Sequence, residues 1–237
     1  MARLGIISGT IFLQGAGVFD RPEEQRINTA FGQAQVVLTD RVAFIPRHGT
    51  DTDHYILPHR INHAANLCAL KALGAEEVIA VNSTGSMKRA MKPGIFVVPD
   101  DFVMLFPGPT VFHDKPVHIT PSLDGNIRRH LLEAARDCGI YVFDGGVYWH
   151  KEGPRFETKA EIRFMSRSAD LVGMTMASEA SVAKELDMAY ASLCSVDNYA
   201  HGIVDEPLTM DEVMGHARQN TEAAIKIVKR YLERRGS

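Results

Sequence analysis

Short apolar runs that end in turn-forming residues recur along the chain and predict buried β-strands. They lie at Leu4–Ser8, Gln35–Leu38, Val42–Pro46, Glu77–Asn82, Ile95–Pro99, Gly146–Trp149, Leu171–Met174 and Met188–Val196. Longer segments with apolar residues at helical spacing separate them. This alternation predicts an α/β fold, a sandwich of helices around a central, mostly parallel or mixed β-sheet. Ligands of such folds bind at the carboxyl ends of the strands.

Helix boundaries follow from capping and stop signals. One helix is predicted from Pro58 to about Leu73, and a second from about Leu123 to Cys138, each followed directly by a glycine. Thr158 and Thr209 each precede a glutamate by three residues, which is the pattern of a capping box, and both predict helix starts. The last helix then extends to about Glu233.

Composition and charge exclude several classes of protein. The 237 residues are 45% hydrophobic and carry a formal net charge of -3, which fits a single globular domain spanning residues 1–237 and excludes a disordered or fibrous chain. The charge balance argues against a protein that binds nucleic acid backbones. No apolar stretch is long enough to span a membrane, and three cysteines without a C-x-x-C spacing support neither a disulfide framework nor a zinc site. We therefore expect a cytoplasmic protein.

Three strands run into residues that suit an anion. Ser8-Gly9-Thr10 follows the first strand, Arg47-His48-Gly49 follows the strand at Val42–Pro46, and Asn82-Ser83-Thr84-Gly85-Ser86 follows a later one. Each taken alone also fits an ordinary turn or a surface arginine, but the three together favour a phosphate site, where a guanidinium fork, hydroxyls and backbone N–H groups converge. Neither G-x-x-x-x-G-K-[ST] nor G-x-G-x-x-G is present, so the phosphate is predicted to be a substrate rather than part of a nucleotide.

Longer motifs carry a resemblance to a known family. The stretches GIISGT, PRHG, ILPHRINHAAN, VNSTGS, EGPRFETKAEI, LVGMT and NYAHGI occur in this order over nearly the whole chain. They resemble the trimeric purine nucleoside phosphorylase and methylthioadenosine phosphorylase family. The resemblance implies a phosphorylase-type sandwich, a homotrimer or a dimer of trimers, and cleavage of a purine nucleoside by inorganic phosphate. It also implies that no metal or organic cofactor takes part.

The same resemblance assigns roles to individual residues. The phosphate site would consist of Thr10, Arg47, His48, Ser83 and Thr175. Phe156 would stack on the purine and Met174 would pack under the ribose. Glu157 and Asn198 would read the base and stabilise it as a leaving group.

Glu157 and Asn198 favour a 6-oxopurine over a 6-aminopurine. Relatives that take 6-aminopurines carry aspartates at the positions of Asn198 and Ala200 and a small hydroxyl residue at that of Glu157. A carboxylate accepts the N1–H of hypoxanthine or guanine, and an amide donates to O6, whereas adenine presents a lone pair at N1. The alternative is that Glu157 is a solvated acid at a helix N-terminus.

The 5′ substituent is the second discriminating feature. Relatives for ordinary nucleosides place a histidine near the start of the final helix, where this chain has Met210. A thioether packs well against a methylthio group, so the resemblance is strongest to the S-methyl-5′-thioinosine phosphorylase branch; Met210 as a hydrophobic helix-end residue is the alternative. His216 would restore hydroxyl binding if it pointed into the pocket. His54, in a stretch about two residues longer than in relatives, is an uncertain match to a histidine near the 5′ group.

The sequence also bears on functions other than that of a phosphorylase. His59 and His63 lie four residues apart, but no H-E-x-x-H motif or third ligand supports a metal site. A non-catalytic purine-binding protein on the same fold and a hydrolytic nucleosidase remain as rivals. Phosphorolysis of inosine or guanosine, or of methylthioadenosine, is the alternative activity.

Overall fold

The computed structural model describes residues 3–9, 19, 22–51 and 53–235. In this part of the chain, eleven strands form one mixed sheet. The strands are β1 (Arg3–Ser8), β2 (Glu23–Thr29), β3 (Gly32–Leu38), β4 (Val42–Pro46), β5 (Ala75–Ser86), β6 (Phe96–Val98), β7 (Asp101–Val103), β8 (Val142–Asp144), β9 (Val147–His150), β10 (Leu171–Gly173) and β11 (Ala189–Tyr199). The helical segments are η1 (Pro58–Arg60), α2 (His63–Ala72), α3 (Gly125–Asp137), α4 (Lys159–Met165), α5 (Met176–Glu185) and α6 (Met210–Arg235).

Strand β5 is the centre of the sheet. It pairs in parallel with β1 and β11 along most of its length, and its last residues pair antiparallel with β10. One path runs β2-β3-β4-β1-β5-β10-β9-β7, and β11 leads from β5 to β6 and β8. The sheet therefore divides at the carboxyl end of β5, the kind of position where α/β folds bind ligands.

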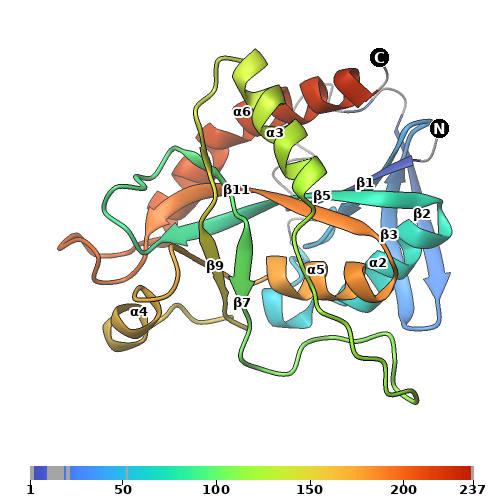
Figure 1. Cartoon of the computed structure of the whole chain (residues 1–237), viewed down its shortest axis with the longest axis horizontal. Coiled ribbons are helices and arrows are strands. Elements are labelled where there is room, and N and C mark those ends of the chain that lie inside the picture. The colour runs from blue at the N-terminus through green and yellow to red at the C-terminus, as the bar shows by residue number, and fades with distance from the viewer. Residues whose placement is uncertain (1–2, 10–18, 20–21, 52, 236–237) are drawn as a thin grey trace.

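Helices cover both faces of the sheet. Helices α3 and α6 lie on one face, and α2 and α5 lie on the other (Figure 1). Each pair encloses its own apolar core. One core joins α2 and α5 to the sheet through residues such as Leu67 and Val182, and the other joins α3 and α6 through residues such as Leu131 and Val228. A smaller cluster around Trp149 and Ile162 fixes α4 to β9 and β10.

The predicted α/β sandwich with a mixed sheet is confirmed. The strand predicted at Val42–Pro46 matches β4 residue for residue, and the other predicted strands overlap observed ones. The predicted end of a strand at Asn82 was wrong. Strand β5 continues through Asn82-Ser83-Thr84-Gly85-Ser86, because β10 and β11 supply backbone partners there. Strands β2, β7 and β8 and helix α5 were not predicted.

The helix predicted from Pro58 to Leu73 was wrong as one element. A short 3-10 turn at Pro58–Arg60 comes first, and Asn62 then caps α2 by accepting a hydrogen bond from the N–H of Ala65 at 2.9 Å. The capping box at Thr158 is confirmed, with Glu161 closing it. The last helix begins at Met210, directly after Thr209, as expected.

Candidate active site

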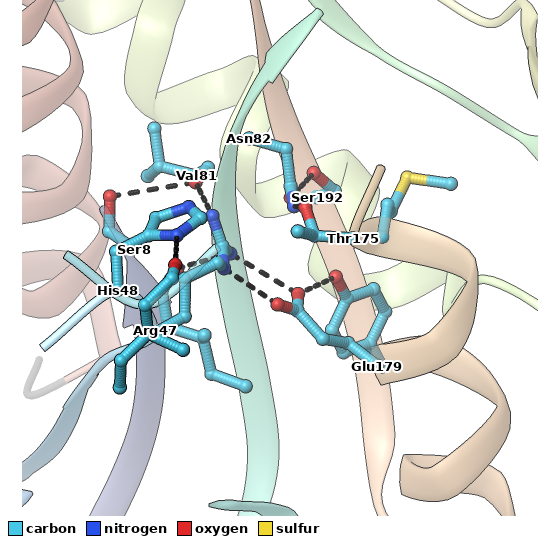
Figure 2. Close-up of polar contacts among 12 residues, drawn as sticks. Ser8, Arg47, His48, Val81, Asn82, Thr175, Glu179 and Ser192 are labelled. Atoms are coloured by element: carbon cyan, nitrogen blue, oxygen red, sulfur yellow. Dashed lines mark hydrogen bonds and ion pairs between the residues drawn. The ribbon is translucent and has the colours of Figure 1, made fainter. Parts of the chain in front are cut away.

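Arg47 follows β4 and lies beside the carboxyl end of β1 and the middle of β5, where it is 3% exposed. Its Nε donates to Oε1 of Glu179 at 2.7 Å, and its Nη2 donates to Oε2 at 3.2 Å. Nη1 donates to the carbonyl of Val81 at 2.8 Å, and Nη2 donates to that of Ile7 at 3.1 Å (Figure 2). These four bonds leave one of the five guanidinium N–H groups for a ligand.

Glu179, on α5, fixes the orientation of this guanidinium. Its side chain is 1% exposed, and the hydroxyl of Tyr190 donates to its Oε2 at 2.7 Å. Burial raises the pKa of Glu179, and the charge of Arg47 opposes that shift. We take the carboxyl as ionised, because three short bonds reach it and two of them come from a permanent cation. The guanidinium fork that was expected at the phosphate site is therefore occupied by a protein carboxylate.

Asn82 connects this ion pair to Thr175. Its amide donates to Oγ1 of Thr175 at 2.8 Å, and its oxygen accepts from the hydroxyl of Ser192 at 2.6 Å. The backbone N–H of Thr175 donates to the hydroxyl of Tyr148 at 3.1 Å. The amide of Asn82 also helps to lower the pKa of Glu179. Arg47 and Thr175 therefore belong to one buried polar network with Asn82 and Glu179, of which Glu179 was not singled out from the sequence. Figure 2 shows the contacts around Arg47 and those around Asn82 close together.

His48 lies next to this network as a neutral imidazole. Burial, followed by the charge of Arg47, lowers its pKa to about 4. Its Nδ1 lies 2.7 Å from the carbonyl of Ile56, and its ring stacks on Tyr55. A carbonyl only accepts, so Nδ1 carries the proton and Nε2 is a hydrogen-bond acceptor.

The remaining residues predicted for the phosphate site are arranged differently. Ser83 is exposed, and its hydroxyl favours the charged form of Asp197, whereas the neighbouring Asn82 joins the network with Thr175. Successive side chains of a strand point to opposite faces. The hydroxyl of Ser83 therefore lies on the face away from Thr175. Thr10 lies outside the described residues.

The residues predicted to read the base gather where the EGPRFET segment meets the end of β11. Glu157 is 5% exposed, burial raises its pKa, and its Oε1 has no hydrogen-bond partner in the described part of the chain. His201 lies 3.1 Å from the carbonyl of Glu157 through Nδ1, which joins this segment to the one that follows Asn198. An unpartnered carboxylate oxygen in a buried place is a ready acceptor for a ligand N–H.

Asn198 is buried, and its amide donates to the carbonyl of Tyr199 at 2.8 Å. A Cβ at Gly85 would lie 3.0 Å from this amide nitrogen, so a larger residue there would push the Asn198 side chain from its place against β5. Phe156 is partly exposed. Met174 packs against Gly153, where a Cβ would lie 2.6 Å from its sulfur. The sequence motif EGP therefore supports Met174 through a glycine.

Met210 and His54 are not joined to these groups by the contacts of the described residues. Met210 is the first residue of α6 and is 55% exposed. His54 is exposed, and its Nδ1 pairs with Asp51 at 2.6 Å.

The described residues contain no group of three or more His, Cys, Asp or Glu side chains arranged to hold a metal ion. They also contain no helix long and apolar enough to cross a membrane.

Comparison with known proteins identifies the family of the chain. The Phosphorylase superfamily profile matches residues 14–233. The chain belongs to this superfamily. It is 42% identical to a probable 6-oxopurine nucleoside phosphorylase of Archaeoglobus fulgidus, covering 98% of this chain and 96% of that one. It is 40% identical to a probable S-methyl-5′-thioinosine phosphorylase of Methanocaldococcus jannaschii, covering 97% and 91% of the two chains.

A solved structure of the superfamily has the same fold. The adenosine/methylthioadenosine phosphorylase of Schistosoma mansoni, in a variant complexed with methylthioadenosine, superimposes with a TM-score of 0.87. The match covers 100% of this chain and 92% of that one at 27% identity. The superfamily resemblance drawn from the motifs is thus confirmed over nearly the whole chain.

Proposed function

We propose that this phosphorylase cleaves 6-oxopurine nucleosides, and S-methyl-5′-thioinosine first among them. Inosine and guanosine are the second candidates, because the exposed Met210 leaves the 5′ preference open. With methylthioinosine and phosphate, the products are hypoxanthine and 5-methylthioribose 1-phosphate, as in purine salvage. The observation that carries the proposal is the buried Glu157 carboxyl with its unpartnered Oε1, beside the segment that holds Asn198.

Glu157 and Asn198 supply the groups that a 6-oxopurine needs. The ionised Glu157 accepts the N1–H of the base, and the Asn198 amide donates toward O6 and N7. Adenine would set its N1 lone pair against the carboxylate, and a mismatch of this kind costs about 1–3 kcal/mol when buried. Phe156, partly exposed, offers its ring as a stacking surface for the purine.

In this proposal, hydrogen-bonding groups around Arg47 hold the phosphate. Arg47 offers its remaining N–H group, and the hydroxyl of Thr175 and the amide of Asn82 lie in the same network. His48 presents Nε2 as an acceptor, which suits the one P–OH group of hydrogen phosphate. Ser83 contributes its backbone N–H in this proposal rather than its hydroxyl, and Thr10 completes the set by the motif resemblance.

The reaction needs no protein nucleophile. The bond between C1′ and the purine nitrogen lengthens, its electron pair moves into the base, and a phosphate oxygen forms the new bond to C1′. Hydrogen bonds from Asn198 and to Glu157 favour the charge that grows on the leaving purine, because they are in place before the reaction. The purine anion then takes a proton from water. No step calls for a metal or an organic cofactor.

The assembly and location belong to the same proposal. We infer a homotrimer or a dimer of trimers in the cytoplasm. Exposed apolar side chains beside the proposed site support an interface there: Tyr55 and Ile56 contact His48, and Phe156 precedes Glu157. In this proposal a partner subunit at this face brings Met210 and His54 to the 5′ group. A mass measurement in solution that gives a monomer would contradict the trimer.

Detection of the sugar product tests the activity. The protein is incubated with methylthioinosine and phosphate, and the mixture is followed by phosphorus NMR and by chromatography of the purine. We expect hypoxanthine and a pentose 1-phosphate in equal amounts. Free methylthioribose without a phosphate ester would establish the hydrolytic nucleosidase instead, and unchanged nucleoside would favour the purine-binding protein.

A further inference from the structure

A cavity of about 710 Å³ lies between α3, the last turns of α6 and the start of β5. The two helices lie on one face of the sheet (Figure 1). Glu77, which lines the cavity, is near the first residue of β5, whereas Gly85, beside Asn198, lies eight residues further along the strand. At the rise of a β-strand this separation is about 26 Å. The cavity is therefore at the opposite end of the sheet from the proposed active site.

Arginine side chains dominate the charge of this cavity. Those that line it are on α3 and at the end of α6: Arg129, Arg230, Arg234 and Arg235. Among the described lining residues the one carboxylate is Glu77, and Arg235 donates to it at 2.9 Å. The carboxylates that pair with Arg230 and Arg234 are not part of the described lining. The wall thus presents net positive charge, which favours an anionic ligand.

Two of these arginines keep N–H groups for a ligand. Nε of Arg230 donates to Asp137 at 2.8 Å and its Nη1 donates to Glu233 at 3.1 Å, so the described residues leave its Nη2 unused. Arg129 has no carboxylate within ion-pair distance in the described part of the chain, and its Nη2 lies 3.4 Å from the side-chain oxygen of Asn126. Guanidinium groups with free N–H bonds match the oxygens of a phosphate group.

Tyr231 adds a buried hydroxyl to the same cavity. Its side chain is 3% exposed, and its hydroxyl has no hydrogen-bond partner among the residues that the structure describes. Burial, followed by the charge of Glu77, raises the pKa of Tyr231, so the hydroxyl keeps its proton and can donate it to an anion. A buried polar group left in this state costs free energy unless a ligand or water pairs with it.

The same wall has an apolar part. Ile127, which is buried, lines the cavity together with the ring of Tyr231. The ring of His130 meets that of Tyr231 edge-on, with 6.3 Å between the ring centroids. Sites for small molecules have volumes of about 300–1,000 Å³ and combine apolar walls with a few polar groups. The cavity is thus larger than an inorganic anion needs and suits an anion with an organic part.

We propose that this cavity binds an organic phosphate of nucleotide size, at a second site separate from the proposed active site. The phosphate group accepts hydrogen bonds from Arg129 and Arg230 and from the hydroxyl of Tyr231. The organic part of the ligand packs on Ile127 and on the ring of Tyr231. Neither the proposed reaction nor the residues that read the base use this site.

Calorimetric titration with ADP at low ionic strength tests the site. The unmodified protein is compared with Arg129→Gln, which changes an exposed residue, and with Tyr231→Phe, which removes only a hydroxyl. The matched controls are Arg218→Gln, at an exposed position of α6, and Tyr141→Phe, at an exposed tyrosine. A hydrogen bond to a charged group corresponds to about a tenfold change in affinity or more.

We expect one ADP per chain, a Kd about tenfold higher in each of the two site variants, and a change of less than about twofold in the controls. Pyrophosphate should bind more weakly than ADP, and adenosine should not bind here. Glu179→Gln, which alters the proposed phosphate site, should leave the Kd for ADP unchanged.

Three results would overturn the inference. The first is no binding of ADP by the unmodified protein, or equal binding by Arg129→Gln and Tyr231→Phe. The second is loss of ADP binding in Glu179→Gln, which would assign ADP to the proposed active site. The third is pyrophosphate binding as tight as that of ADP, which would mean that the apolar wall takes no part. Because the titration involves no cleavage of a nucleoside, its result is independent of whether the proposed phosphorolysis is correct.

Discussion

Arg47 directs two of its guanidinium nitrogens at the two carboxylate oxygens of Glu179, at 2.7 and 3.2 Å, with both side chains almost wholly buried. Carbonyl groups of Ile7 and Val81 take two further N–H groups. The cation is therefore held rigidly and is already neutralised by Glu179 before any phosphate arrives. Its orientation, more than its net charge, is what it contributes to an anion site.

Replacing Glu179 by glutamine should weaken phosphate binding selectively. The amide keeps one acceptor but loses the bidentate charge-assisted pair, so the guanidinium is no longer fixed. We expect KM for phosphate to rise by about tenfold, while KM for the nucleoside stays within about twofold. Steady-state kinetics with each substrate varied in turn measures this. Glu133→Gln, which removes an exposed ion pair with Arg234, is the control. Equal increases in both KM values would argue against a role through Arg47.

Replacing Glu157 by glutamine should raise stability and lower activity. Because burial raises the pKa of Glu157 in the folded state, its ionised form costs stability at pH values above that pKa, and the cost disappears as the carboxyl protonates. We expect the variant to melt about 2–4 °C higher at pH 8, with the difference vanishing near pH 4. Phosphorolysis of 6-oxopurines should fall by about tenfold or more. A variant that melts lower than the parent at pH 8 would contradict the account of burial.

Exchange of the two base-reading residues should change the preferred purine. In the double variant Asn198→Asp with Glu157→Ser, the carboxylate at N1 is gone and an acid faces N7 and the 6-substituent. We expect the ratio of kcat/KM for methylthioadenosine over methylthioinosine to rise by about a hundredfold. The single variants serve as controls and should move the ratio less. Proportional loss on both purines would mean that the two residues do not read the base.

A histidine at position 210 should favour nucleosides with a 5′-hydroxyl. An imidazole offers the hydroxyl a partner and packs less well against a methylthio group than methionine does. We expect Met210→His to raise the ratio of kcat/KM for inosine over methylthioinosine by about threefold to tenfold. Met210→Leu, which stays apolar, should leave the ratio near its original value. If the histidine variant behaves like the leucine variant, residue 210 does not contact the 5′ group.

Elements with a clear hydrophobic period or a capping signal were predictable from the sequence. Strand β4 and the start of α4 at Thr158 are examples, because an apolar run and a capping box are local signals. Helix α5 was not predicted because all of its sides are buried and many of its residues, such as Ala177 and Ala180, are small. It therefore has no amphipathic period. The break at Asn62 was not predicted because Pro58, a favoured first residue of a helix, begins a separate 3-10 turn.

The sequence predicts those site residues that stand out in a local motif, but not the distant residues that contact them. Arg47 and Glu157 stand out in their motifs, but the partner of Arg47 lies far along the chain on α5, and no local pattern indicates that Glu179 reaches it. The segment after Asn82 resembles a Ser/Gly turn, and tertiary pairing with β10 and β11 makes it a strand. That pairing separates the side chain of Ser83 from that of Asn82. A sequence motif does not report which face of the sheet each residue takes.

The most direct test of the central claim is the rate of base release from four nucleosides, each with and without phosphate. The nucleosides are methylthioinosine, inosine, guanosine and methylthioadenosine. The account predicts release that depends on phosphate, fastest with methylthioinosine, next with inosine and guanosine, and slowest with methylthioadenosine. Release that is independent of phosphate, or a preference for methylthioadenosine, would contradict it.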